Sequence, residues 1–176
     1  MKERLRRAGI RSLGACVDVT NYVMLELGQP MHAFDLARLD SYIEVRYADG
    51  KEELELLDGS TLRPETTDLL VADKSGPLAL AGVMGGASSA VSGQTQDIFL
   101  ESAFFPPEIV AVTSRDRGVR SDSSHRFERG VDFQLQYEAI ERASHLLTEI
   151  AGGLCGPIIE KTVKRKMPHK EPVQLR

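Results

Sequence analysis

The stretch LLVADKSGPLALAGV, residues 69–83, decides the fold class of this chain. Residues 69–72 and 77–83 are apolar and favour strands, whereas the polar residues 73–76 between them favour a turn. The pattern predicts a β-hairpin. This hairpin lies inside a longer β-rich tract, residues 42–103, so we expect a sheet at the centre of the domain.

Other parts of the tract carry the same signals. Residues 42–47 alternate in the manner of a half-buried strand, and residues 98–103 form an apolar strand. A second hairpin is predicted where residues 54–57 and 61–63 flank Asp58-Gly59, because this dipeptide supplies the positive φ angle of a tight turn.

Helices are predicted on both sides of the β-rich tract, at residues 2–8, 18–27, 108–116 and 134–150. The last has the clearest apolar stripe and ends at Gly152-Gly153. Residues 31–35 are expected to form a loop, with Asp35 capping a short turn at 36–39, and residues 157–161 a final strand. Because the order is not a regular β-α-β alternation, the prediction is an α/β fold: a compact, layered domain with a mixed, largely antiparallel sheet flanked by helices.

Composition excludes several classes of protein. The chain has 176 residues, 41% of them hydrophobic, which suits one domain with a substantial core. Its apolar runs are too short to cross a bilayer, and its first residues lack a signal-peptide pattern, so no membrane partner is predicted. Two cysteines form neither a disulfide framework nor a metal-ligand spacing, which predicts a cytoplasmic protein without a metal site. The net charge of −4 argues against binding nucleic acid by charge alone.

Three polar segments and one carboxylate are candidates for chemistry. Residues 20–35 contain His32, which is either a surface histidine or a pocket residue. The glycines of residues 81–89 either let a ligand approach the backbone or form a plain turn, and no helix pattern follows them as a nucleotide site requires. Residues 115–130 are either a polar loop with ion pairs or a site. A serine and a histidine two residues apart, Ser123 and His125, suggest a serine hydrolase, but no nucleophile-elbow motif is present. Glu101 interrupts the apolar run 98–105, so it faces solvent, a partner or a ligand, and simple alternation would point it outward with Phe99.

Several colinear segments resemble the B3/B4 region of the bacterial phenylalanyl-tRNA synthetase β subunit. They are VDVTNYVMLE at 17–26, GQPMHAFD at 28–35, the glycine loop 82–86, LESAFF at 100–105 and SHRFERG at 124–130. The resemblance implies that residues 1–161 are an editing domain and that residues 162–176 are a basic linker to the next domain of a much longer parent chain. We therefore expect an excised domain.

The resemblance also implies a function. The domain would hydrolyse tyrosine wrongly esterified to phenylalanine tRNA, because an apolar synthetic pocket rejects an added hydroxyl imperfectly. Its partners would be the 3′ end of phenylalanine tRNA, tyrosine as the editing ligand, and the synthetase α subunit in an (αβ)2 assembly. The parent would use ATP and Mg²⁺, whereas this domain would need no cofactor. The alternative is a non-catalytic tRNA-binding or structural module whose editing pocket has decayed.

The site residues follow from the same resemblance. Glu101 would accept the hydrogen bond of the tyrosine hydroxyl. His32, Asn21 and Thr20 would surround the ester and position the attacking water, and a general-base role for His32 is left open. The remaining substrate-binding positions would be Arg11 at the mouth, Gly82, Gly85 and Gly86 in the loop, and Ser121 and Ser123 in the wall, where the family commonly has Thr and Ala.

Overall fold

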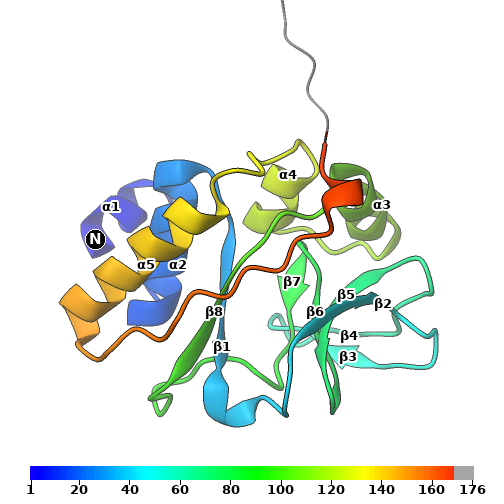
Figure 1. Cartoon of the computed structure of the whole chain (residues 1–176), viewed down its shortest axis with the longest axis horizontal. Coiled ribbons are helices and arrows are strands. Elements are labelled where there is room, and N and C mark those ends of the chain that lie inside the picture. Colours follow the sequence, from blue (N-terminus) through cyan, green and yellow to red (C-terminus); the bar gives the residue numbers. More distant parts are fainter. Residues whose placement is uncertain (169–176) are drawn as a thin grey trace, which may run out of the picture.

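Two antiparallel strand systems form the centre of the computed structural model, which describes residues 1–168 (Figure 1). The first is a two-stranded ribbon of β1 (Met31–Asp35) and β8 (Ile98–Ser102). The second is a four-stranded sheet in the order β2-β5-β6-β7, and beside it lies a short hairpin, β3-β4. Their bounds are Glu44–Tyr47 for β2, Leu54–Glu55 for β3, Thr61–Leu62 for β4, Leu69–Asp73 for β5, Gly76–Leu80 for β6 and Met84–Gly85 for β7.

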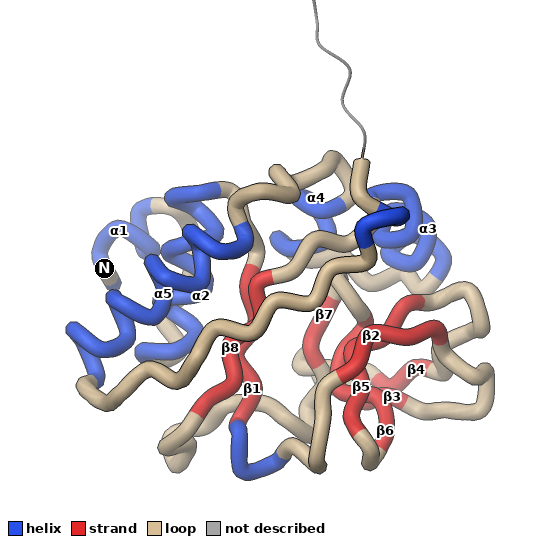
Figure 2. Tube along the Cα trace, viewed as in Figure 1, coloured by secondary structure: helices blue, strands red, loops and turns tan. Residues whose placement is uncertain are grey.

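The helices lie on one side of the ribbon and across one end of the strands (Figure 2). α2 (Ala15–Leu27) and α5 (Gln136–Ala151) pack on each other and on the ribbon, and α1 (Lys2–Arg7) packs on α2. α3 (Pro107–Asp116) and α4 (Asp122–Phe127) pack together near the four-stranded sheet. The predicted α/β class, with antiparallel strands flanked by helices, is therefore confirmed.

Both predicted hairpins are present, because local turn chemistry specifies them. In the β5-β6 turn the side chain of Asp73 accepts hydrogen bonds from the backbone N–H groups of Ser75 and Gly76, at 2.8 and 3.2 Å. At the other hairpin Gly59 adopts a φ of +83°, as the Asp-Gly dipeptide predicted.

The loop predicted at residues 31–35 is wrong, because these residues form β1. The segment pairs residue by residue with β8, from Met31 opposite Ser102 to Asp35 opposite Ile98. Its partner lies more than sixty positions away, so the hydrogen bonds that make it a strand have no local signal. Asp35 caps the following turn as predicted, accepting from the N–H of Ala37 at the start of η1 (Leu36–Arg38).

Three further differences concern α4, the start of α2 and residues 157–161. α4 lies inside segment 115–130, where a polar loop was one reading; its N-cap Ser121 and Ser124 form a reciprocal capping box. α2 begins at Ala15, three residues earlier than predicted. The strand predicted at 157–161 is absent: these residues are irregular and lead to η2 (Lys164–Lys166). The remainder of the predicted linker, residues 169–176, lies outside the described residues.

The ribbon separates two hydrophobic cores. Met31, Ile98 and Leu100 pack with α2 and α5, whereas Phe34 and Phe99 belong to the core of the four-stranded sheet. Side chains alternate across a strand, so Glu101 lies on the same face as Phe99. That face packs on the core of the four-stranded sheet and does not face bulk water. The alternative in which Glu101 points outward is therefore excluded.

Candidate active site

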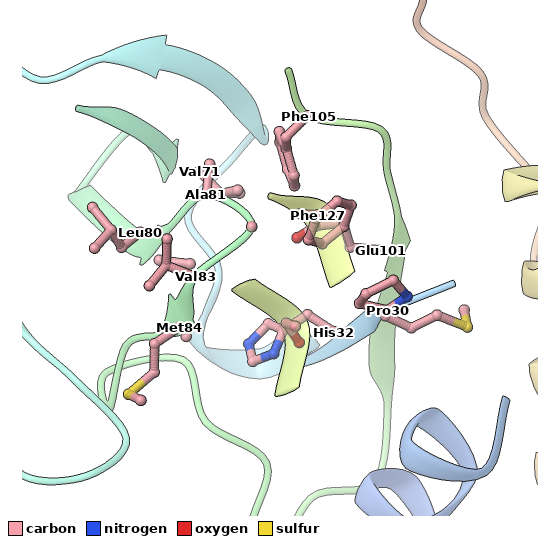
Figure 3. A pocket seen from close by; sticks show the side chains of 15 residues that line it. Pro30, His32, Val71, Leu80, Ala81, Val83, Met84, Glu101, Phe105 and Phe127 are labelled. Carbon is pink, nitrogen blue, oxygen red and sulfur yellow. The ribbon is translucent and has the colours of Figure 1, made fainter. Parts of the chain in front are cut away.

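A small cavity of about 50 Å³ opens where the ribbon, the glycine loop and α4 meet (Figure 3). Its walls include the two ionisable residues His32 and Glu101, which come from neighbouring strands. The remaining lining residues are Pro30, Met31, Val71, Ala79, Leu80, Ala81, Gly82, Val83, Met84, Gly85, Phe105, Ser123 and Phe127. The wall is thus mainly apolar, with two titratable groups in it.

His32 is held against the ring of Phe34, with the two ring centroids 4.4 Å apart in an edge-to-face arrangement. Its Nε2 is buried and has no hydrogen-bond partner among the described residues. Burial lowers the pKa of the imidazole to about 4. At neutral pH His32 is therefore an uncharged ring with one unpaired polar nitrogen.

Gly85 makes room for this ring. A Cβ atom built on Gly85 would lie 2.7 Å from Nε2 of His32 and 3.1 Å from a methyl group of Leu57. Real Cβ atoms are essentially never found within 3.0 Å of another heavy atom, so any larger residue would displace the imidazole. Gly85 therefore leaves space for the His32 side chain and not only for a ligand, a role that the sequence did not reveal.

Glu101 stands directly opposite His32 in the β1-β8 register. Side chains of opposite residues in an antiparallel pair lie on the same face, so both belong to one wall. Burial raises the pKa of the Glu101 carboxyl to about 7, and no described side chain donates a hydrogen bond to it. At neutral pH the acid is therefore close to half-ionised.

The other two predicted glycines have packing roles. Gly82 has a φ of +71°, and a Cβ there would lie 2.9 Å from Val110 and 3.1 Å from Phe105. Gly86 donates its N–H to the Leu78 carbonyl at 2.7 Å, and it does not line the cavity. Both glycines allow the loop to pack closely on the core.

Ser121 and Ser123 differ in their positions. Ser123 lines the cavity, as predicted. Ser121 does not; its hydroxyl donates to the carbonyl oxygen of Val83 at 2.5 Å and accepts from the N–H of Ser124 at 3.0 Å. These two hydrogen bonds connect the start of α4 to the glycine loop, outside the cavity lining.

Three predicted residues lie outside the cavity lining. Thr20 is buried within α2, and its hydroxyl donates to the Val17 carbonyl at 3.0 Å. Asn21 is half-buried on the same helix, and Arg11 is exposed in the segment before it. The structure thus brings His32, Glu101 and Ser123 together with the loop, but not Thr20, Asn21 and Arg11.

Phe105 and Phe127 were not predicted as site residues. Their rings pack edge to face at 5.3 Å in the cavity wall. Aromatic residues in apolar segments are more often ordinary core residues, so no sequence pattern distinguishes these two as site residues.

The arrangement does not support a serine hydrolase. Ser123 lines the cavity, whereas His125 is exposed with its Nδ1 3.1 Å from the Arg129 guanidinium. A catalytic serine needs a base within hydrogen-bond reach, and no hydrogen bond joins Ser123 to His125 among the described residues. Within residues 1–168 no group of three or more His, Cys, Asp or Glu side chains could hold a metal ion. In the same range no helix combines the length and apolar character of a membrane span.

Comparison with known proteins gives a consistent result. The sequence model of the B3/4 domain matches residues 1–152. Over its whole length the chain is 57% identical to the phenylalanine–tRNA ligase beta subunit of Nitrosococcus oceani, 54% to that of Mannheimia succiniciproducens and 56% to that of Pseudomonas fluorescens. It spans 22% of the length of each of these relatives.

Among solved structures, the comparison finds a similarity to an N-terminal fragment of the phenylalanyl-tRNA synthetase beta subunit from Pyrococcus horikoshii. The TM-score is 0.44 and the identity 12%, over 60% of this chain and 40% of that one.

Proposed function

The chain belongs to the B3/4 domain family, and on that premise we propose that it is the editing domain of a phenylalanine–tRNA ligase β subunit. It would hydrolyse tyrosine that has been esterified in error to phenylalanine tRNA. The observation that carries the proposal is the pairing of His32 with Glu101 across the ribbon, in the wall of one aromatic-lined cavity.

Glu101 supplies the specificity. Tyrosine differs from phenylalanine by one hydroxyl, and a site that hydrogen-bonds this group rejects the substrate that lacks it. The carboxylate has no competing donor among the described residues, so a phenol can donate to it directly. Phe105 and Phe127 provide apolar surface for the ring that carries the phenol.

His32 would hold the water. An aminoacyl ester is already activated, so positioning a water and stabilising developing charge can suffice for hydrolysis. A pKa of about 4 makes the imidazole a weak base at neutral pH, but in the tautomer that carries its proton on Nδ1 the unpaired Nε2 can still accept a hydrogen bond from water. We therefore assign to His32 the role of orienting the water, and not that of a general base that takes up its proton.

Of the predicted residues outside the cavity lining, Arg11 would contact the tRNA. Arg11 is an exposed cation that suits a phosphate of the tRNA 3′ end. In this proposal the parent enzyme ligates phenylalanine with ATP and Mg²⁺ in the cytoplasm, together with an α subunit, and its other domains hold the body of the tRNA. The net charge of −4 then does not prevent this domain from binding the 3′ end of the tRNA.

One observation favours the second candidate, a structural module without hydrolytic activity. A cavity of about 50 Å³ accommodates a few water molecules, whereas pockets for drug-sized ligands occupy roughly 300–1,000 Å³. Under the editing proposal the wall must therefore widen when tyrosine enters. Met84, a flexible side chain in the lining, is suited to such movement.

The deciding experiment measures hydrolysis of tyrosyl-tRNA and phenylalanyl-tRNA by the complete ligase that contains this domain. We expect Glu101→Gln to lower the preference for the tyrosyl ester and His32→Ala to slow hydrolysis. Glu108→Gln, an exposed glutamate at the start of α3, is the matched control and should behave as wild type. A wild-type enzyme that leaves tyrosyl-tRNA intact would support the structural module instead.

A further inference from the structure

Gln29 lies immediately behind the cavity wall and is fully buried, with 0% of its surface exposed. Its side-chain Nε2 donates to two backbone carbonyls, those of Pro30 and Ala103, each at 2.8 Å. Its Oε1 accepts a hydrogen bond from Nε2 of Gln136, at 3.0 Å. A buried polar side chain with this set of partners is expensive to replace, because each partner would lose its bond.

The position of Pro30 explains why this amide is needed. The β1-β8 register pairs Met31 with Ser102, so Pro30 stands opposite Ala103 one step further along. Proline has no N–H and cannot donate to a neighbouring strand. The Gln29 amide instead donates to the Ala103 carbonyl, and so continues the ribbon one step beyond its backbone hydrogen bonds.

This end of the ribbon is the end that forms the active-site wall. Pro30, Met31 and His32 all line the cavity, and Glu101 is two residues before Ala103. A separation of the strands at Pro30 and Ala103 would therefore change the spacing of His32 and Glu101. Gln136, the first residue of α5, also donates to the Asp132 carbonyl at 2.9 Å, which ties the junction to the helix layer.

We propose that Gln29 is a positioning residue for the active site, which acts by closing the β1-β8 ribbon where Pro30 interrupts it. It does not line the cavity, and it acts through the strands that carry His32 and Glu101. The inference deepens the proposed editing function and rests on it for the choice of substrates.

The first test does not depend on catalysis. Amide hydrogen exchange is compared between the wild-type ligase and its Gln29→Met variant, at both ends of the ribbon. We expect faster exchange at the end near Met31 and Ser102, with protection retained at the end near Phe34 and Phe99. Equal protection of the two proteins at both ends overturns the proposal, and so does a uniform loss over the whole ribbon, which indicates general destabilisation.

The second test measures the ratio of kcat/KM for tyrosyl-tRNA and phenylalanyl-tRNA. Loss of folded protein lowers both values alike and leaves the ratio unchanged, whereas a displaced Glu101 lowers the ratio. We expect a fall on the order of tenfold in Gln29→Met, since small displacements of site groups have effects of this size or larger. An unchanged ratio overturns the positioning role.

Two more variants complete the design. Thr95→Val removes the 2.7 Å hydrogen bond to Asp35 at the opposite end of the ribbon, and it should keep the wild-type ratio. Where Gln29→Met does not fold, Gln29→Asn decides, because its shorter amide keeps the donors but cannot span both carbonyls. A wild-type enzyme that hydrolyses neither ester refutes the editing function, and hydrogen exchange then decides the role of Gln29 independently.

Discussion

Replacing Glu101 with glutamine should stabilise the domain above neutral pH. Burial raises the pKa of the Glu101 carboxyl from 4.5 to about 7 in the folded protein. Between pH 4.5 and 7 the folded state keeps a proton that the unfolded state has released, so the free energy of unfolding falls as the pH rises. The stabilising contribution of the protonated acid is therefore complete below about pH 4.5. It is lost as the pH rises through 7, because the charged carboxylate is poorly solvated in the cavity wall.

The size of the effect follows from the shift. A shift of about 2.5 units, at about 1.4 kcal/mol per unit, gives an upper limit near 3.5 kcal/mol, and partial exposure of the residue reduces it. Glutamine stays uncharged at every pH. The stability difference between Glu101→Gln and wild type should therefore be small at pH 4.5 and rise to between about 1 and 3 kcal/mol at pH 8. His32 titrates in both proteins, so its contribution cancels in this difference.

Urea denaturation at several pH values between 4.5 and 8 measures the difference directly. Glu108→Gln is the control, since this glutamate is exposed and its replacement should give no such slope. A difference between Glu101→Gln and wild type that stays constant over the whole pH range would refute the reasoning, because it would show that Glu101 titrates normally in the folded protein.

Three other predictions concern neighbouring residues. His32→Gln should flatten the loss of stability on acidification, because the lowered pKa of His32 gives a contribution that is complete above pH 6.5 and lost as the pH falls through 4. The upper limit of this contribution is also about 3.5 kcal/mol. Urea titrations measure it, with the exposed His145 changed in the same way as the control. Gly85→Ala should cost about 1–3 kcal/mol through the clash with the His32 ring, and the NMR signals of that ring should shift; an unmoved ring would contradict the close contact. Ser121→Ala should lower the free energy of unfolding by about 1 kcal/mol, because the helix cap of α4 and the hydrogen bond to the Val83 carbonyl are lost. Thermal unfolding measures this change, and equal stability would show that the capping box is unimportant.

Several features of the fold were predictable because their causes are local. The Asp58-Gly59 turn, the Asp73 turn and the apolar stripe of α5 depend on residues within a few positions of one another. The Gly28 that ends α2 adopts the left-handed conformation that glycine accepts readily. Such features need no knowledge of what lies elsewhere in the chain.

The active-site geometry depends on partners that are distant in the sequence. Residues 31–35 become a strand only because β8 supplies their hydrogen bonds, and α4 was missed because one short capping box, not an apolar period, starts it. The resemblance named Glu101, His32 and Gly85, but not that Gly85 accommodates the His32 ring or that Ser121 bonds to Val83.

The sequence alone thus determined the class of the fold, the turns, most helix ends and the family, since these follow from local patterns and from long colinear motifs. Only the tertiary structure decided which face of the ribbon Glu101 occupies, and hence its protonation. Pairing β1 with β8 places Glu101 opposite His32 over a buried core, where desolvation shifts both groups toward their uncharged forms. Burial depends on how distant segments of the chain pack together, so no local stretch of sequence determines it.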